Sequence, residues 1–98
     1  MYIKLHQSYR KVIAVADTDL IGKKFEEGKF QLDIRENFYK GSEMQEEELI
    51  KFMQRQAKED ASFNIVGEES VKAAIKAGII FPEYVGRIAN IPYALTLL

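Results

Sequence analysis

Two aspartates stand two residues apart directly after an apolar run, and carboxylates in that position can hold a divalent cation. They are Asp17 and Asp19, and Asp33 or Glu36 would supply a third oxygen ligand. The same Asp-Thr-Asp pattern is also typical of helix caps and turns. We favour that structural role. The alternative is a small metal-assisted enzyme that acts on a phosphorylated substrate through Asp17 and Asp19.

Basic residues interleaved with tyrosines form a second candidate site. The chain carries a net charge of −1, but residues 1–40 hold eight Lys or Arg against six Asp or Glu, a net charge of +2. Lysines contact phosphates and tyrosines stack on bases. We therefore predict an RNA or partner contact on one face, against the alternative of an ordinary solvated surface. Its residues are Tyr9, Arg10, Lys11, Lys23 and Lys24.

Residues 64–68 (NIVGE) provide a third candidate site, because a helix is expected to begin there. The free N–H groups of a helix start can bind an anion or a carboxylate of a partner. We accordingly take Asn64 and Gly67 as candidate contacts. Glu68 and Glu69 would repel a phosphate, which favours a purely structural junction as the alternative.

The residue types give little support for cysteine, histidine or serine chemistry. The chain has no cysteine, which excludes disulfides and thiolate sites. His6 is its single histidine, and no serine lies in a Gly-x-Ser-x-Gly context. We expect no cofactor, and catalysis is less favoured than binding. No apolar run has the length of a signal peptide or a membrane helix, so we expect a cytoplasmic protein with no membrane partner.

The elements that must position these residues follow from the hydrophobic pattern. Residues 2–7 and 11–16 alternate or are rich in Val and Ile, which predicts a hairpin around a turn at 8–10. A short helix is expected from 17–19 to Gly28, a strand over 30–34 and a turn over 37–41. Apolar residues at helical spacing predict helices over 45–59 and 67–77, joined by a connection over 64–67.

The end of the chain is predicted to contain a strand over 84–89 and an apolar tail over 93–98. The tail must pack on the body of the protein or on a second copy of the chain, which would make a homo-oligomer. Taken together, the elements predict one α+β domain over residues 1–98. Its mixed or antiparallel sheet would have about four strands, covered on one face by two main helices and one short helix.

Six segments in order resemble a small archaeal protein family that is known only as a domain of unknown function. They are residues 21–25 (IGKKF), 27–29 (EGK), 38–41 (FYKG), 64–68 (NIVGE), 77–79 (AGI) and 91–94 (IPYA). The resemblance covers nearly the whole chain and implies an archaeal cytosolic protein. It implies no activity. From the residues themselves we favour a non-catalytic binding or adaptor module, with RNA or a ribonucleoprotein as its partner.

Overall fold

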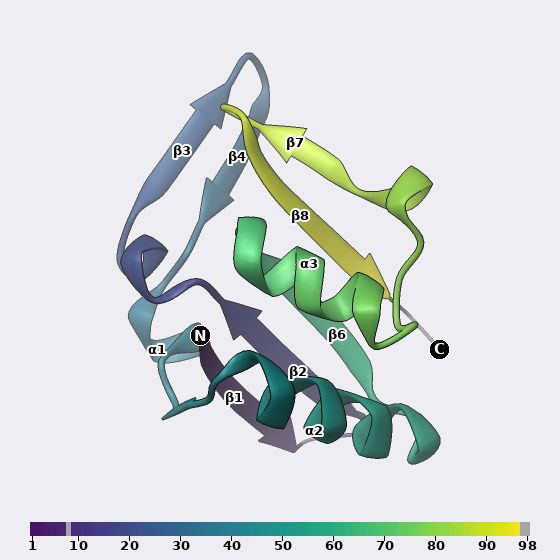
Figure 1. The fold of residues 1–98 in the computed structure, drawn as a ribbon. Helices are drawn as coiled ribbons and strands as arrows, with labels where there is room; N and C mark the ends of the chain where they lie inside the picture. The colour runs from purple at the N-terminus through teal and green to yellow at the C-terminus, as the bar shows by residue number, and fades with distance from the viewer. Residues whose placement is uncertain (8, 97–98) are drawn as a thin grey trace.

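The computed structural model describes residues 1–7 and 9–96, and it contains a six-stranded sheet and a separate two-stranded hairpin (Figure 1). The strands of the large sheet have the order β5-β1-β2-β6-β8-β7. Their bounds are β1 Tyr2–Gln7, β2 Lys11–Ala16, β5 Ser42–Glu43, β6 Ser62–Val66, β7 Gly86–Ile88 and β8 Ile91–Thr96. Only β2 and β6 run parallel; every other pair in this sheet is antiparallel.

Two helices cover one face of the sheet. They are α2, Glu46–Lys58, and α3, Glu68–Lys76. Glutamates occupy the first turn of each helix and lysine the last, as the helix dipole favours. The main hydrophobic core lies between these helices and the sheet. Its largest fully buried members include Phe63, Ile13, Leu49, Met53 and Ile65.

The opposite face of the sheet, here called the back face, is covered only in part. The β3–β4 hairpin, formed by Lys24–Glu27 and Phe30–Asp33, and the short helix α1, Glu36–Tyr39, pack on it. A second hydrophobic cluster joins these elements to the sheet, with Ala16, Leu20, Ile34 and Val66 buried at its centre. All three elements behind the sheet come from residues 1–40.

The structure confirms the mixed α+β content, the first two strands and the two main helices. The sheet is larger than predicted, with six strands rather than four. The connection predicted over 64–67 is largely strand β6, which is buried on both faces and so lacks the alternation of a half-buried strand. The turn predicted over 37–41 contains most of α1.

The short helix predicted between residues 17 and 28 is wrong. Only a single 3-10 turn, Thr18–Leu20, follows β2, and β3 then occupies Lys24–Glu27. Phe25 pairs with Leu32 across the β3–β4 hairpin. This cross-strand packing outweighs the helical spacing of the apolar residues.

The predicted apolar tail is the strand β8, which is inserted between β6 and β7. Its residues pack within the protein's own sheet, and two of the predicted tail residues, Leu97 and Leu98, lie outside the described residues. Ser8, in the first predicted turn, lies outside them too. The strand predicted over 84–89 is reduced to β7, because the 3-10 turn η2, Pro82–Tyr84, precedes it.

Candidate functional site

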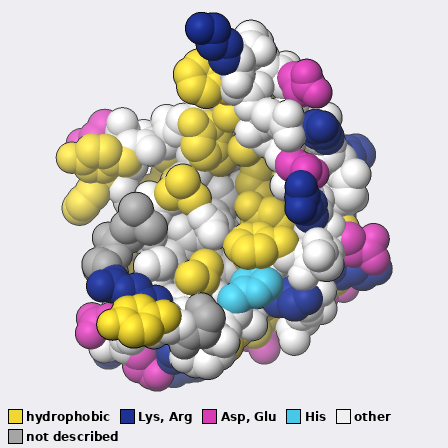
Figure 2. All heavy atoms as spheres, turned by 180° about the vertical axis from the view of Figure 1, so that it is seen from behind, with side chains coloured by type: hydrophobic (Ala, Val, Ile, Leu, Met, Phe, Trp, Pro, Cys, Tyr) yellow, Lys and Arg dark blue, Asp and Glu magenta, His cyan; other side chains and the backbone are white. Residues whose placement is uncertain are grey.

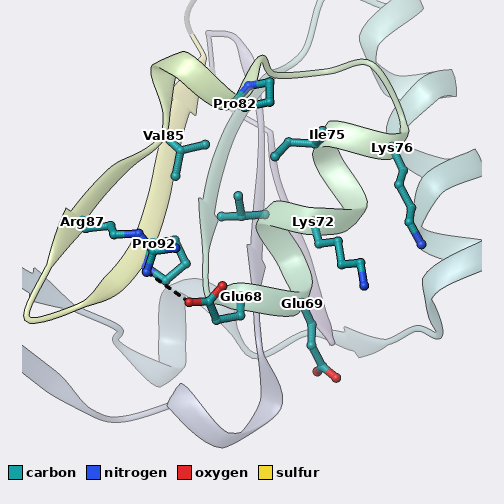
Figure 3. A pocket seen from close by; sticks show the side chains of 10 residues that line it. Glu68, Glu69, Lys72, Ile75, Lys76, Pro82, Val85, Arg87 and Pro92 are labelled. Carbon is teal, nitrogen blue, oxygen red and sulfur yellow. Dashed lines mark hydrogen bonds and ion pairs between the residues drawn. The ribbon is translucent and has the colours of Figure 1, made fainter.

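An open groove runs between α3 and the strand β7, on the helix-covered side of the sheet (Figure 3). The groove has a volume of about 670 Å³, within the range of ligand and peptide sites. Its apolar lining comes from three elements: Val71 and Ile75 on α3, Pro82 and Val85 around η2, and Pro92 on β8. We call this feature the α3–β7 groove.

Charged side chains are ordered along the groove. Glu68 and Glu69 stand at the first turn of α3, whereas Lys72 and Lys76 stand further along the same helix. Arg87 of β7 reaches across the groove to Glu68 at 3.1 Å. The end of the groove at the first turn of α3 therefore carries Glu68, Glu69 and Arg87, and its other end is apolar (Figure 3). Lys72 and Lys76 lie on the side of α3 away from β7, where Lys76 pairs with Glu46 of α2 at 2.8 Å.

The outer edge of β7 offers unpaired main-chain groups beside this groove. Arg87 lies opposite Pro92 in the β7–β8 ladder, and proline has no N–H to donate. The carbonyl of Pro92 accepts instead from the N–H of Gly67, on the β6 side, at 2.9 Å. The N–H and C=O of Arg87 consequently point away from β8. No strand in residues 1–7 and 9–96 pairs with that edge.

The structure places Asp17 in a structural role. Its carboxylate is buried and accepts hydrogen bonds from the N–H groups of Glu69, at 3.1 Å, and Ser70, at 2.8 Å. The hydroxyl of Ser70 donates a third bond at 2.7 Å. These are N–H groups that an isolated helix start leaves free. Asp17 thus caps α3, a helix distant in sequence, and not the short helix that follows Asp17.

The metal alternative gains no support from this arrangement. Both oxygens of Asp17 are directed at α3, and Asp19 is exposed on the 3-10 turn. Within the described part of the chain, no group of three His, Asp or Glu side chains could hold a metal ion. Asp33, named as a third ligand, forms an ion pair with Arg35 at 2.9 Å.

The five residues predicted to contact RNA do not form one surface. Tyr9, Arg10 and Lys11 surround the β1–β2 turn, whereas Lys23 and Lys24 follow the other end of β2. A strand of this length separates the two groups by roughly 17 Å. Lys11 is also engaged, because it forms an ion pair with Glu59 at 2.6 Å and donates to Gln56 at 2.8 Å. The structure therefore divides the five residues into two separate groups.

Asn64 and Gly67 have separate environments. The N–H of Gly67 donates to the carbonyl of Pro92, so it is not available to an anion. Asn64 lies in the middle of β6, and it lines a hollow on the back face of the sheet. No hydrogen bond of its side-chain amide is present among the described residues. Asn64 is thus a candidate contact, although on a strand and not at a helix start.

The part of the hollow around Asn64 has a mixed lining, and the adjoining part is mainly apolar and aromatic. Asp33, Arg35 and Asn37 lie beside Phe38 and Tyr39 in the first part. Two adjoining cavities of about 320 and 280 Å³ share Tyr39 as a wall. Figure 2 shows hydrophobic side chains gathered around this depression, with Lys and Arg side chains near its margin. We call it the back-face hollow, and its principal residues are Phe30, Leu32, Phe38, Tyr39, Asn64, Tyr93 and Leu95. Burial raises the pKa of the Tyr39 phenol above 10.0, which keeps its hydroxyl protonated near neutral pH.

Sequence reasoning missed both surfaces for physical reasons. The groove brings α3 against a hairpin some twenty residues later, and neither contributes a motif. Leu95 and Phe30 are the residues that reveal the back surface, because they remain 63% and 68% exposed in the structure. Exposed large apolar side chains of this kind mark binding surfaces.

The fold and these surfaces define an α+β protein with a mixed six-stranded sheet, two covering helices and two open hollows. The chain belongs to DUF424, a family described as proteins of unknown function, whose family model matches residues 6–97. A crystal structure of an uncharacterized conserved protein from Methanopyrus kandleri has the same fold. Its TM-score is 0.88 at 23% sequence identity, over 97% of this chain and 88% of that one.

No curated protein matches the chain. Among the helices formed by the described residues, none has the length and apolar character needed to cross a membrane.

Proposed function

We propose that this protein is a non-catalytic binding module that holds an extended, mainly apolar segment of a protein partner in the α3–β7 groove. The observation that carries the proposal is the free edge of β7 beside that groove. An added strand would pair with the N–H and C=O of Arg87 and direct alternate side chains toward the apolar floor. An unpaired strand edge presents N–H and C=O groups with which an added strand can pair.

The charges of the groove favour one direction for the bound segment. Arg87 of β7 contacts Glu68 at the start of α3, and Pro82, which precedes β7, lines the groove with Ile75 near the end of α3, so α3 and β7 run in opposite directions. A strand antiparallel to β7 would therefore run from the Glu69 end of α3 toward Lys72, two charges with no ion-pair partner among the described residues. The preferred partner segment carries a basic residue at its N-terminal end and an acidic residue or a carboxylate at its C-terminal end.

A fluorescence titration with a synthetic peptide tests the proposal. The peptide begins with lysine, continues with three valines that alternate with threonines, and ends with glutamate. A second peptide has the two charged residues exchanged. We expect the first peptide to bind at least fivefold more tightly than the second, because each terminal charge then faces its opposite.

Charge reversal in the protein provides the matched control. Lys72→Glu should weaken binding of the first peptide about fivefold and restore binding of the exchanged peptide. Lys51→Glu, an exposed change on α2 outside the groove, should leave both affinities unchanged. Equal binding of both peptides, or equal effects of the two substitutions, would contradict the proposed site.

A further inference from the structure

We infer that the back-face hollow binds unpaired bases of single-stranded RNA. This second site lies on the side of the sheet away from the α3–β7 groove. It does not depend on the peptide-binding function, because the two surfaces share no side chain.

The walls of the hollow carry aromatic rings. Phe30, Tyr39 and Tyr93 line one part of the hollow, and Phe38 lines the other. Phe38 already stacks on His6, with ring centroids 4.3 Å apart and an angle of 16° between the ring planes. Proteins bind single-stranded nucleic acids by stacking bases on aromatic side chains such as these. Phe30, at 68% exposed, is the wall residue most open to an incoming base.

The floor of the hollow carries a polar side chain, Asn64. The amide of Asn64 is half-buried between strands β2 and β8, and no described side chain or main-chain group bonds to it. An amide donates and accepts at adjacent atoms, and the edge of a base does the same. The hydroxyl of Tyr39 adds a donor that stays protonated at neutral pH. These groups suit a base better than an aliphatic protein side chain.

Lysines without a carboxylate partner lie in and around the elements behind the sheet. These elements, residues 24–39, hold three Lys or Arg and four Asp or Glu, so they carry no net positive charge. In residues 1–40, however, four lysines have no carboxylate within ion-pair distance among the described residues. They are Lys4, Lys23, Lys24 and Lys29. Lys29 immediately precedes Phe30 in the hairpin, so a phosphate joined to a stacked base would find a cation nearby.

This site differs from the RNA patch predicted from the sequence. Lys23 and Lys24 keep a role as flanking cations, but the bases are held by the aromatic hollow and not by Tyr9. Protein partners usually bury apolar surface without needing flanking cations. The combination of aromatic walls, a free amide and lysines without a carboxylate partner therefore favours RNA as the occupant of the hollow.

The test is a fluorescence anisotropy titration with a labelled twelve-nucleotide single-stranded RNA of mixed sequence, at low and near-physiological salt. We expect binding that weakens as salt rises. Phe30→Ala should weaken binding about tenfold, because a stacking partner is lost. Asn64→Ala should weaken it severalfold. Phe81→Ala removes an equally exposed aromatic ring outside the hollow and should have no effect.

Several results would overturn the inference. One is no binding of the single strand even at low salt. Another is binding that Phe30→Ala and Asn64→Ala leave unchanged, since the RNA would then lie elsewhere. If a duplex RNA binds as tightly as the single strand, the hollow does not stack unpaired bases. If single-stranded DNA of the same sequence binds as tightly as the RNA, the site does not select RNA. Circular dichroism of each variant separates these results from loss of the fold.

Discussion

The carboxylate of Asp17, at the end of β2, caps the helix that begins fifty residues later by accepting two hydrogen bonds from Ser70. The main-chain N–H of Ser70 lies 2.8 Å from Oδ1 and its hydroxyl lies 2.7 Å from the same oxygen. β2 and β6 are the parallel pair of the sheet, and this contact ties their carboxyl ends to the start of α3. Asp17, which the sequence offered as a possible metal ligand, thus stabilises the junction between the sheet and α3.

Removing this cap should destabilise the protein, beginning at the first turn of α3. We expect Asp17→Ala to lower the free energy of unfolding by about 2 kcal/mol, because three donors lose their acceptor. Urea denaturation measures the change. Asp19→Ala, at an exposed position of the 3-10 turn, should change it by less than about 0.5 kcal/mol. Equal effects of the two substitutions would contradict the capping role.

The residue before α3 must remain glycine. Gly67 has a φ of 110°, and a Cβ there would overlap the carboxylate of Asp17. We expect Gly67→Ala to cost about 3 kcal/mol of unfolding free energy, from backbone strain and from displacement of the cap.

Gly78→Ala separates those two causes. Gly78 also has a positive φ, 77°, but a Cβ there meets no atom within 4 Å. Its substitution should cost about 1 kcal/mol, which is the backbone strain alone. If both alanine variants lose the same free energy of unfolding, displacement of the Asp17 carboxylate adds nothing to the cost of Gly67→Ala.

Ionisation of the Tyr39 phenol should lower the free energy of unfolding at high pH. Burial raises the pKa of this phenol in the folded state, so the folded protein resists its ionisation. The stabilisation is present below pH 10.0 and is lost as the pH rises through the folded-state value. Unfolding measured between pH 8 and 11 should show this decline, and Tyr39→Phe should reduce it. A decline unchanged in Tyr39→Phe would contradict the assignment.

Two exposed glutamates should titrate independently of each other. A hydrogen bond from Lys11 lowers the pKa of Glu59, and one from Lys76 lowers the pKa of Glu46. Each therefore favours the folded state above the usual glutamate range and loses that contribution as the pH falls. In NMR titrations, Lys11→Ala should raise the pKa of Glu59 alone, and Lys76→Ala that of Glu46 alone. A shift of both glutamates in either variant would show long-range coupling.

The sequence could predict those elements whose pattern is local. The alternation of residues 2–7 and the helical stripe around Leu49 and Met53 need no knowledge of the rest of the chain. Strand β6 was not predicted as a strand, because burial on both faces removes the alternation of apolar and polar residues. Strand β8 was predicted only as an apolar tail, because its place in the sheet is set by its two neighbours, β6 and β7.

The candidate sites were less predictable than the fold. Asp17 was predicted to cap the short helix that follows it, and it caps α3 instead. The contact with α3 could not be known before β2 and β6 were paired. Asn64 was singled out for the wrong reason, since its open environment comes from the sheet and not from a helix start. The α3–β7 groove arises only when Arg87 is placed opposite Pro92, a pairing between β7 and β8.

The measurement that most directly tests the central claim is the ¹H–¹⁵N NMR spectrum of the protein during titration with the lysine-to-glutamate peptide. The N–H of Arg87 should shift strongly and become protected from hydrogen exchange, because it gains a strand partner. The amides of Val71 and Ile75 should shift with it. Signals from β5, at the opposite edge of the sheet, should remain in place. Saturating peptide that leaves the Arg87 amide unshifted and freely exchanging would contradict strand addition at β7 and the function built on it.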